Sequence, residues 1–455
     1  MSEVTISNLP ISENQHFFCQ LIEDILAEAK RLGASDAAAE VSESRGLSVS
    51  VRKQQPDTVE QARERCLGIT VYDGQKRGTA TTADFTPTAL REAVAAAWHI
   101  ARYTAEDPAA GLPEADDLAF QYPDLALYRP WSIDAEQATE WALRAERAAL
   151  NYDSEITNSE GASVDSLEGH FVLGNTRGFL GGYPYSRHSI GMSPIAGVGE
   201  QMQRDYWYSV ARAAHKLDSP EEVGRIAAQR TISRLQARSV PTGRYPVVFE
   251  APLAAGLLGA FVRANSGGAL YRQASFLLDA LGEEVFPAHV SILERPHLRG
   301  GLGSAPFDGE GVYTRARAVV EEGALQGHFL SSYTARKLGL QTTGNADGAH
   351  NLLLHSTRTR PDLDLPALLR EMGTGLLVTE LIGQGVNFVT GDYSRGAFGY
   401  WVEGGEIQYP VQEITIAGNL RDMFRQMALV GSDQLIRGGR ETGSVLIEQM
   451  AIAGS

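Results

Sequence analysis

The densest group of chemically capable side chains in this sequence is formed by Asp392, Tyr393, Ser394 and Arg395. An acid, a phenol, a hydroxyl and a guanidinium follow one another there, with a glycine on either side. Glycines allow a second chain to approach the backbone closely, so this segment suits the binding of a peptide or of a facing subunit. The alternative is a tight turn in which Asp392 and Ser394 bond to neighbouring backbone amides. Both interpretations predict a loop over residues 390–396.

Histidines are the other candidates for chemistry, because a zinc site needs two or three His or carboxylate ligands close together. Three groups are worth testing: His350 with His355, His289 with Glu294 and His297, and His170 with His188 on adjacent predicted strands. The first pair brackets an apolar run without a neighbouring acid, and a proline interrupts the second group. We therefore favour structural roles for these histidines and assign no catalytic or metal-binding residue to the chain.

Other common catalytic signatures are missing from the sequence. It contains no G-x-S-x-G nucleophile motif, no phosphate-binding G-x-x-x-x-G-K-[ST] loop and no G-x-G-x-x-G that opens a helix. Several aromatic residues could line a peptide groove, although strands also use such residues for packing, which we favour. They are Tyr183, Tyr185, Tyr206, Trp207 and Tyr208.

The polar segment 390–396 must be positioned by the strands around it. Apolar runs at 376–382, 386–389, 397–402 and 407–411 predict a meander of short strands. The last two runs are separated by Glu403, Gly404, Gly405 and Glu406. A two-residue hairpin turn needs positive φ at both central positions, which two glycines supply, so we predict a tight hairpin here.

Helical spacing of apolar residues predicts helices at 17–32, 86–103, 134–150, 219–235 and 253–262, with others at 364–372 and after residue 419. Short strands are predicted between the first four, at 37–41, 47–51, 67–72, 79–82, 163–167, 170–173, 179–185, 188–192 and 206–210. Prolines at 241 and 246 mark a boundary. The sequence therefore predicts an α+β fold with two domains. Residues 1–240 form an α+β domain of helices and antiparallel strands, and residues 241–455 form a mainly β domain, a sheet or partial barrel with a few helices.

Composition is that of a soluble globular protein. The 455 residues are 43% hydrophobic and 21% charged, with a mean hydropathy of −0.19, and no apolar run is long enough to span a membrane. The first residues lack the basic flank and apolar centre of a signal peptide, which predicts a cytoplasmic location. A net charge of −16 argues against nucleic acid as a partner, because phosphate binding needs a basic surface.

Several long segments resemble one protein family. They are GDYSRGAFGYWVEGGEIQYPVQEITIAGNL from residue 391, LGITVYDGQKRGTATTADFTP from 67, LYRQASFLLDALGEEVFP from 270 and SSYTARKLGLQTTGNADGAHN from 331. These segments are similar to the TldD/PmbA metalloprotease family, also called modulators of DNA gyrase, and within it to subunits of the PmbA (TldE) type. The resemblance extends along nearly the whole chain.

This resemblance implies a cytoplasmic complex of two kinds of subunit that cleaves unfolded or extended peptides. The TldD-type catalytic subunit carries H-E-x-x-x-H on a helix, and the matching residues here are 259–264, Gly-Ala-Phe-Val-Arg-Ala. Both histidines and the glutamate are missing, and nowhere in the chain is a histidine followed directly by a glutamate. We therefore expect no cofactor in this chain and zinc in the TldD-type partner. We also expect Asp392, Tyr393, Ser394 and Arg395 to meet substrate or partner.

Two other functions stay open from the sequence. The chain could be an autonomous metallopeptidase with an atypical, scattered metal site. It could instead be a non-enzymatic regulator linked to DNA gyrase, as the older family name suggests. The expected partners are a TldD-type subunit and a peptide, with self-association of the isolated chain left open, and neither nucleic acid nor membrane is expected.

Overall fold

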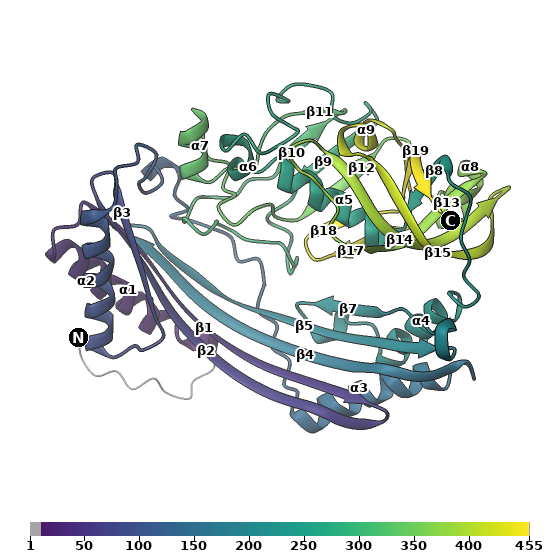
Figure 1. Ribbon diagram of the computed structural model, residues 1–455. Helices are drawn as coiled ribbons and strands as arrows, with labels where there is room; N and C mark the ends of the chain where they lie inside the picture. The colour runs from purple at the N-terminus through teal and green to yellow at the C-terminus, as the bar shows by residue number, and fades with distance from the viewer. Residues whose placement is uncertain (1–10, 455) are drawn as a thin grey trace.

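The computed structural model describes residues 11–454 and consists of a long curved sheet facing a β-rich C-terminal body (Figure 1). The residues from which the absence of a signal peptide was predicted lie mainly in 1–10, outside the described part. The curved sheet has seven strands, in the order β3-β2-β1-β4-β5-β6 with β7 paired to β5, and all its pairings are antiparallel. The strands are β1 Asp36–Arg52, β2 Gln55–Asp73, β3 Lys76–Thr82, β4 Ile156–Asn175, β5 Leu180–Ala196, β6 Gln203–Arg204 and β7 Trp207–Ala211.

These strands are much longer than the sequence predicted. The predicted break between strands at 37–41 and 47–51 is wrong, because Gly46, which lies in that break, pairs with Ala62 on one side and with Leu167 on the other. In the same way β4 and β5 each join two predicted strands into one. Residues 55–66 of β2 were missed because they are polar and exposed. Gly46 has a partner strand on each side, and residues 55–66 have β1 as a partner, so pairing with distant segments holds both in the ladder, which local turn propensity does not reveal.

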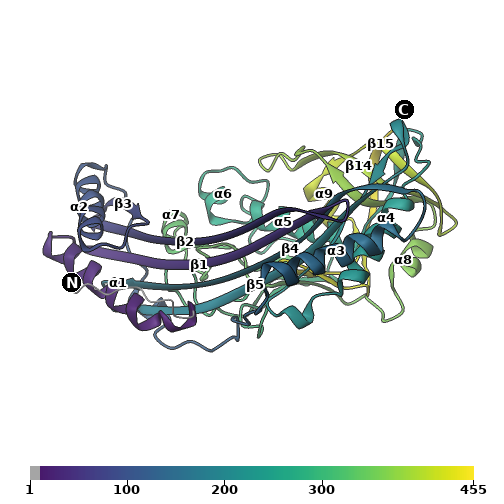
Figure 2. The ribbon, with the colours of Figure 1, turned by 90° about the horizontal axis from the view of Figure 1, so that it is seen from below.

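Four helices cover the convex face of this sheet, as Figure 2 shows from below. Helices α1 Gln15–Arg31 and α2 Pro87–Tyr103 lie at one end, and α3 Ala135–Leu150 and α4 Pro220–Ile232 lie at the other. Side chains cap two of these helices: Thr86 accepts a bond from the Ala89 amide, and Asp134 forms a capping box with Gln137.

Alternation along β1 separates the two faces of the sheet. Val41 packs in the core beneath α1, and Val49 packs beneath α3. Side chains one position away point to the opposite face, toward the C-terminal body. On β1 these are Glu40, Ser42, Ser44, Ser48 and Ser50, which are exposed or half-buried. The concave face is therefore polar, in contrast to the helix-covered face.

The C-terminal body contains two six-stranded sheets. One has the order β15-β14-β13-β8-β19-β16, and an additional β15–β19 pairing closes it into a partial barrel. Its strands are β8 Gly243–Phe249, β13 Gly375–Ile382, β14 Asp392–Glu403, β15 Glu406–Asn419, β16 Met427–Val430 and β19 Val445–Ala453. The other, ordered β11-β10-β9-β12-β18-β17, contains β9 Val290–Glu294, β10 Arg317–Glu321, β11 Ala324–Leu325, β12 Leu352–Ser356, β17 Leu435–Arg437 and β18 Arg440–Thr442.

Helix α5 Ala251–Ala264 is central to this body, and its Leu257 and Phe261 share one core with Val247 and Ile292 from the two sheets. The remaining helices are α6 Gly267–Tyr271, α7 Ser332–Leu338, α8 Leu365–Met372 and α9 Leu420–Arg425, of which α6 and α7 were not predicted. Short 3-10 turns occur at Ile11–Glu13, Ala115–Asp117, Gly199–Gln201 and Ala214–Lys216. The predicted α+β class with a β-rich C-terminal half is confirmed.

The two halves are tied together by more than the chain at residue 240. The segment between α2 and α3, residues 104–134, runs against the C-terminal body. There Leu118 forms a β-bridge with Val312, and Asp107 forms an ion pair with Lys337 at 2.7 Å. None of the helices within residues 11–454 combines the length and the apolar character needed to cross a membrane.

Candidate functional site

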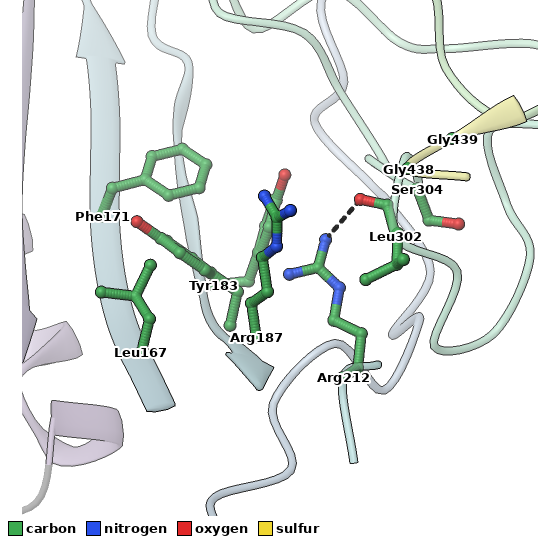
Figure 3. Close-up of a pocket in the computed structure, with 10 residues that line it drawn as sticks. Leu167, Phe171, Tyr183, Arg187, Arg212, Leu302, Ser304, Gly438 and Gly439 are labelled. Carbon is green, nitrogen blue, oxygen red and sulfur yellow. Dashed lines mark hydrogen bonds between the residues drawn. The ribbon is translucent and has the colours of Figure 1, made fainter. Parts of the chain in front are cut away.

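A cavity of about 470 Å³ lies where the concave face of the curved sheet meets loops of the C-terminal body (Figure 3). The sheet contributes Leu167, Phe171, Tyr183, Tyr185, Arg187 and, directly after β7, Arg212. The C-terminal body contributes Leu302 and Ser304 from the segment between β9 and β10, and the glycines at 438 and 439 between β17 and β18. Both halves of the chain are therefore needed to form this cavity.

Arg212 is fixed in the wall of the cavity by backbone carbonyls. Its guanidinium donates to the oxygens of Ser186 at 3.1 Å, Leu302 at 2.9 Å and Gly301 at 3.4 Å. Burial lowers the pKa of Arg212, and the nearby Arg187 guanidinium lowers it further. The bonds to Leu302 and Gly301 join the sheet to the loops of the other half, and among the residues that the structure describes Arg212 has no carboxylate partner.

Two phenols line the same cavity from β5. Tyr183 packs edge-on against Phe171, with ring centroids 4.7 Å apart. Tyr185 lies across Gly169 of β4, where a Cβ atom would come within 2.3 Å of the tyrosine ring. Burial raises the pKa of both tyrosines, so both are neutral hydrogen-bond donors near pH 7.

The concave face continues from this cavity as a polar surface. Asp165 of β4 accepts bonds from Ser48 at 2.7 Å and from Ser189 at 3.2 Å. Beyond it lies a second hollow of about 300 Å³, which is lined by Tyr206, Trp207 and Tyr208 among others. The aromatic residues singled out in the sequence therefore line two neighbouring hollows. Trp207 and Tyr208 on β7 also pack against Arg437, whose guanidinium carbon lies 4.5 Å from the Trp207 ring centre and 4.1 Å from the Tyr208 ring centre.

The segment aligned with the family's H-E-x-x-x-H motif lies on α5, and its residues do not fit a metal. At the first histidine position is Gly259, and a Cβ atom there would lie 3.1 Å from the Arg440 guanidinium. The second histidine position is Ala264, which is fully buried. An arginine cation thus occupies the space beside the first expected metal ligand.

The predicted histidine groups do not assemble in the structure. His170 lies 2.9 Å from the Ile11 carbonyl oxygen, whereas His188 lies 2.9 Å from the Ser166 hydroxyl. They sit on neighbouring strands but pair with Pro184 and Ser166 rather than with each other. The less favoured alternative, in which these two histidines meet, is therefore contradicted.

The histidines of the C-terminal half also have separate partners. His289 contacts the Ser356 hydroxyl, His297 the Thr314 hydroxyl and His350 the Gly344 carbonyl, each at 2.9 Å, while His355 is exposed. Glu294 is paired with Arg317 at 2.8 Å. Within residues 11–454 no group of three or more His, Cys, Asp or Glu side chains is arranged to hold a metal ion.

The polar segment 390–396 differs from its prediction. Residues from Asp392 onward form the start of β14 and pair with β15, so the predicted loop is wrong beyond position 391. Strand alternation turns Tyr393 inward, where it is buried, and leaves Asp392 and Ser394 exposed. Burial raises the pKa of Tyr393 to about 12. The role of this segment stays a prediction, and the exposed residues are those able to meet a partner.

Two polar side chains of this segment, Asp392 and Arg395, form hydrogen bonds with neighbouring parts of the chain. Asp392 accepts a bond from the Thr390 hydroxyl at 2.6 Å, and Arg395 donates to the Leu381 carbonyl at 3.3 Å. The neighbouring hairpin prediction is confirmed, because Gly404 and Gly405 have φ of 58° and 81° and connect paired residues of β14 and β15. The predicted strand at 386–389 is wrong, since only an isolated bridge occurs there.

Sequence reasoning missed the two arginines of the cavity. Arg187 and Arg212 belong to no recognisable motif, and they lie 90 and more residues from the loops that complete the cavity. One signal was available: Tyr183, Tyr185 and Arg187 alternate along one strand and must share a face.

Comparison with known proteins identifies the family. Three family models match, described as PmbA/TldA metallopeptidase domain 1 at residues 37–101, central domain at 128–235 and C-terminal domain at 242–454. The chain is 49% identical to the metalloprotease PmbA homolog of Haemophilus influenzae over 429 residues, 94% of each chain. It is 48% identical to metalloprotease PmbA of Escherichia coli O157:H7 over 438 residues, 96% of each chain.

Solved structures share the fold. A candidate modulator of DNA gyrase from Bacteroides thetaiotaomicron superposes with a TM-score of 0.90 at 26% identity, covering 96% of this chain and 98% of the other. TldE from Thermococcus kodakarensis has a TM-score of 0.84 at 20% identity, covering 95% and 100%, and this similarity concerns the fold alone. From the near-complete coverage and the identity to the bacterial relatives, we conclude that the chain belongs to the PmbA/TldD metallopeptidase family.

Proposed function

We propose that this chain is the non-catalytic PmbA-type subunit of a cytoplasmic two-subunit metalloprotease, and that a TldD-type partner carries the zinc. The observation that carries the proposal is the arrangement at the motif position on α5. Gly259 and Ala264 offer no ligand atoms, and the Arg440 guanidinium fills the adjoining space. The positive charge of Arg440 also repels a metal cation. This position therefore disfavours a metal both because it lacks ligand atoms and because it carries a positive charge nearby.

The proposed substrates are unfolded or extended peptides. The concave face presents mainly polar groups, namely serine hydroxyls and phenols, together with the aromatic hollow lined by Tyr206, Trp207 and Tyr208. Among the residues that the structure describes, it lacks the broad apolar surface with which a protein typically binds a folded partner. Residues 55–66 of β2 pair with β1 on one side only and are almost entirely exposed, so their free edge could pair with an extended chain through its backbone. Main-chain pairing is tolerant of sequence, as cleavage of varied peptides requires.

Relatives support the assignment of the two roles. Two bacterial relatives that match over nearly their whole length are described as a metalloprotease PmbA homolog and as metalloprotease PmbA, and a structure of the same fold is described as TldE. We propose that the partner brings the water-activating metal and the acid-base glutamate, and that this chain encloses the peptide. Asp392 and Ser394, exposed at the start of β14, are proposed to contact the partner or the peptide.

The decisive experiment combines elemental analysis with a peptidase assay on each subunit alone and on their mixture. We expect less than stoichiometric zinc in this chain, stoichiometric zinc in the partner, and chelator-sensitive cleavage that is strong only in the mixture. The matched control is a mixture in which the glutamate of the partner's H-E-x-x-x-H is changed to glutamine, which should be inactive. Tightly bound zinc together with chelator-sensitive cleavage by this chain alone would instead identify an autonomous metallopeptidase.

A further inference from the structure

The lining of the cavity between the two halves carries an unbalanced positive charge, and the carboxylates of Glu40 and Asp347, which act electrostatically on Tyr185 and Tyr183, lie outside that lining. Among the described residues that line it are two arginines, Arg187 and Arg212, and no aspartate or glutamate. This is notable in a chain whose net charge is −16. Positive charges without a counter-ion inside a concave site attract an anion, and low-dielectric walls strengthen that attraction.

The two guanidiniums have different roles. Arg212 is held by three carbonyl oxygens and shapes the wall, as described above. Arg187 is exposed to the cavity and, within the part of the chain that the structure describes, has neither an ion pair nor a hydrogen bond. Figure 3 shows both guanidiniums directed into the space between β5 and the C-terminal loops. Arg187 therefore has its full set of donors available for a ligand.

The rest of the cavity defines what kind of anion fits. The hydroxyls of Tyr183 and Tyr185 have no hydrogen-bond partner among the described residues, so they are additional donors. The opposite part of the wall is apolar, formed by Leu167 and Phe171. The last residue of a peptide carries a carboxylate and a side chain on the same carbon atom, and it would use the donors and the apolar wall together.

We propose that this cavity binds the free C-terminal carboxylate of a peptide, with Arg187 as its bidentate ligand. The peptide as ligand rests on the proposed function, whereas the carboxylate rests on the cavity itself. The remainder of the peptide would lie along the concave face, over Asp165 with its serine partners and toward the aromatic hollow. A guanidinium matches the planar carboxylate through two parallel hydrogen bonds, which a lysine cannot provide.

The test compares two fluorescent peptides that differ only at the C-terminus, one a free acid and one an amide. Binding to the isolated full-length chain is measured by anisotropy for the wild type, Arg187→Gln and Arg187→Lys. The control variant is Arg102→Gln, which removes an exposed arginine of α2 far from the cavity. We expect wild type and control to prefer the acid by about tenfold or more, as for a charge-assisted bond. Arg187→Gln should bind both peptides with the affinity of the amide, and Arg187→Lys should fall between.

Equal affinity of wild type for acid and amide, absence of binding to either peptide, or an acid preference that survives Arg187→Gln would each overturn the proposal. The peptidase assay of the mixture keeps the two proposals separate. Equal cleavage of acid and amide would leave the proposed function intact while this inference fails. Conversely, an acid preference in binding without any cleavage by the mixture would remove the proposed function and leave the carboxylate site.

Discussion

The ion pair between Arg230 and Glu250 connects the two halves of the chain and offers a test of how strongly the halves are held together. Arg230 is on α4 and Glu250 directly precedes α5, and their two hydrogen bonds measure 2.7 and 3.1 Å. The side chains are only 17% and 16% exposed. Burial lowers the pKa of Arg230, but the carboxylates of Glu250 and Asp205 outweigh burial, so its pKa is raised overall.

The expected coupling energy follows from this geometry. With charge centres about 4 Å apart and an effective dielectric constant of about 20, the attraction is about 4 kcal/mol. Desolvation of both groups offsets part of that attraction, which leaves a coupling of about 2 kcal/mol in a double-mutant cycle. Arg230→Ala should lower the free energy of unfolding by about 3 kcal/mol, because it leaves the poorly solvated Glu250 carboxylate without this partner, whereas Glu250→Ala should cost less, because Arg230 keeps Asp205 at 3.4 Å.

The assay is urea denaturation of the wild type, the two single variants and the double variant. Arg144 and Glu221 form the control pair, since their bonds of 2.7 and 3.0 Å have the same bidentate geometry. That pair joins α3 to α4 within the N-terminal half and is 38% and 52% exposed, so its coupling should stay below about 1 kcal/mol. Equal coupling energies in the two cycles would refute the argument that burial and the contact between halves make the first pair strong.

Three further predictions concern other parts of the structure. Hydrogen bonds from Lys337, the Ala109 amide and Tyr333 lower the pKa of Asp107 from 3.8 to about 2. The carboxylate therefore stabilises the fold above about pH 4, and this contribution is lost as the pH falls through about 2. In a plot of the urea midpoint against pH, Asp107→Asn should reduce the slope between about pH 2 and pH 4. On α5, the methyl group of Gly256→Ala enters open space, so this substitution should raise the free energy of unfolding by up to about 1 kcal/mol. Gly259→Ala should give the same gain only when Arg440→Ala removes the neighbouring guanidinium. Thermal unfolding of Gly256→Ala, Gly259→Ala, Arg440→Ala and the Gly259→Ala/Arg440→Ala double variant tests this expectation. At the exposed start of β14, Ser394→Arg should weaken binding to the TldD-type partner at least about tenfold while the free energy of unfolding changes by less than about 1 kcal/mol; unchanged affinity in a pull-down titration would exclude Ser394 from the interface.

Much of the fold could be predicted from local signals. Helices with capping residues, such as the one after Thr86, and the hairpin at Gly404 and Gly405 follow from interactions within a few residues. The lengths of the strands could not be predicted in this way. Gly46 and residues 55–66 look like turn or loop residues, and only their partners in neighbouring strands keep them extended. The proposed division of the chain at residue 240 stays a prediction, to be tested by limited proteolysis.

The candidate site was predicted less well than the fold. The polar residues at 392–395 were visible because they are contiguous, but their strand geometry was not, and alternation buries Tyr393 between two exposed neighbours. The cavity arginines were overlooked because they are isolated in the sequence. Arg212 acquires its role only from carbonyl oxygens at 301 and 302, almost ninety residues away.

The sequence by itself determined the family, the fold class and the loss of the H-E-x-x-x-H residues, because these are recorded in residue identities and in spacings of a few positions. The tertiary structure decided which surface is concave, that Arg187 faces the cavity without an ion pair among the described residues, and that Arg440 lies against Gly259. The physical reason is that burial and charge balance depend on every group nearby in space. In this chain those groups come from strands and loops that are far apart in sequence and meet only when the curved sheet packs against the C-terminal body.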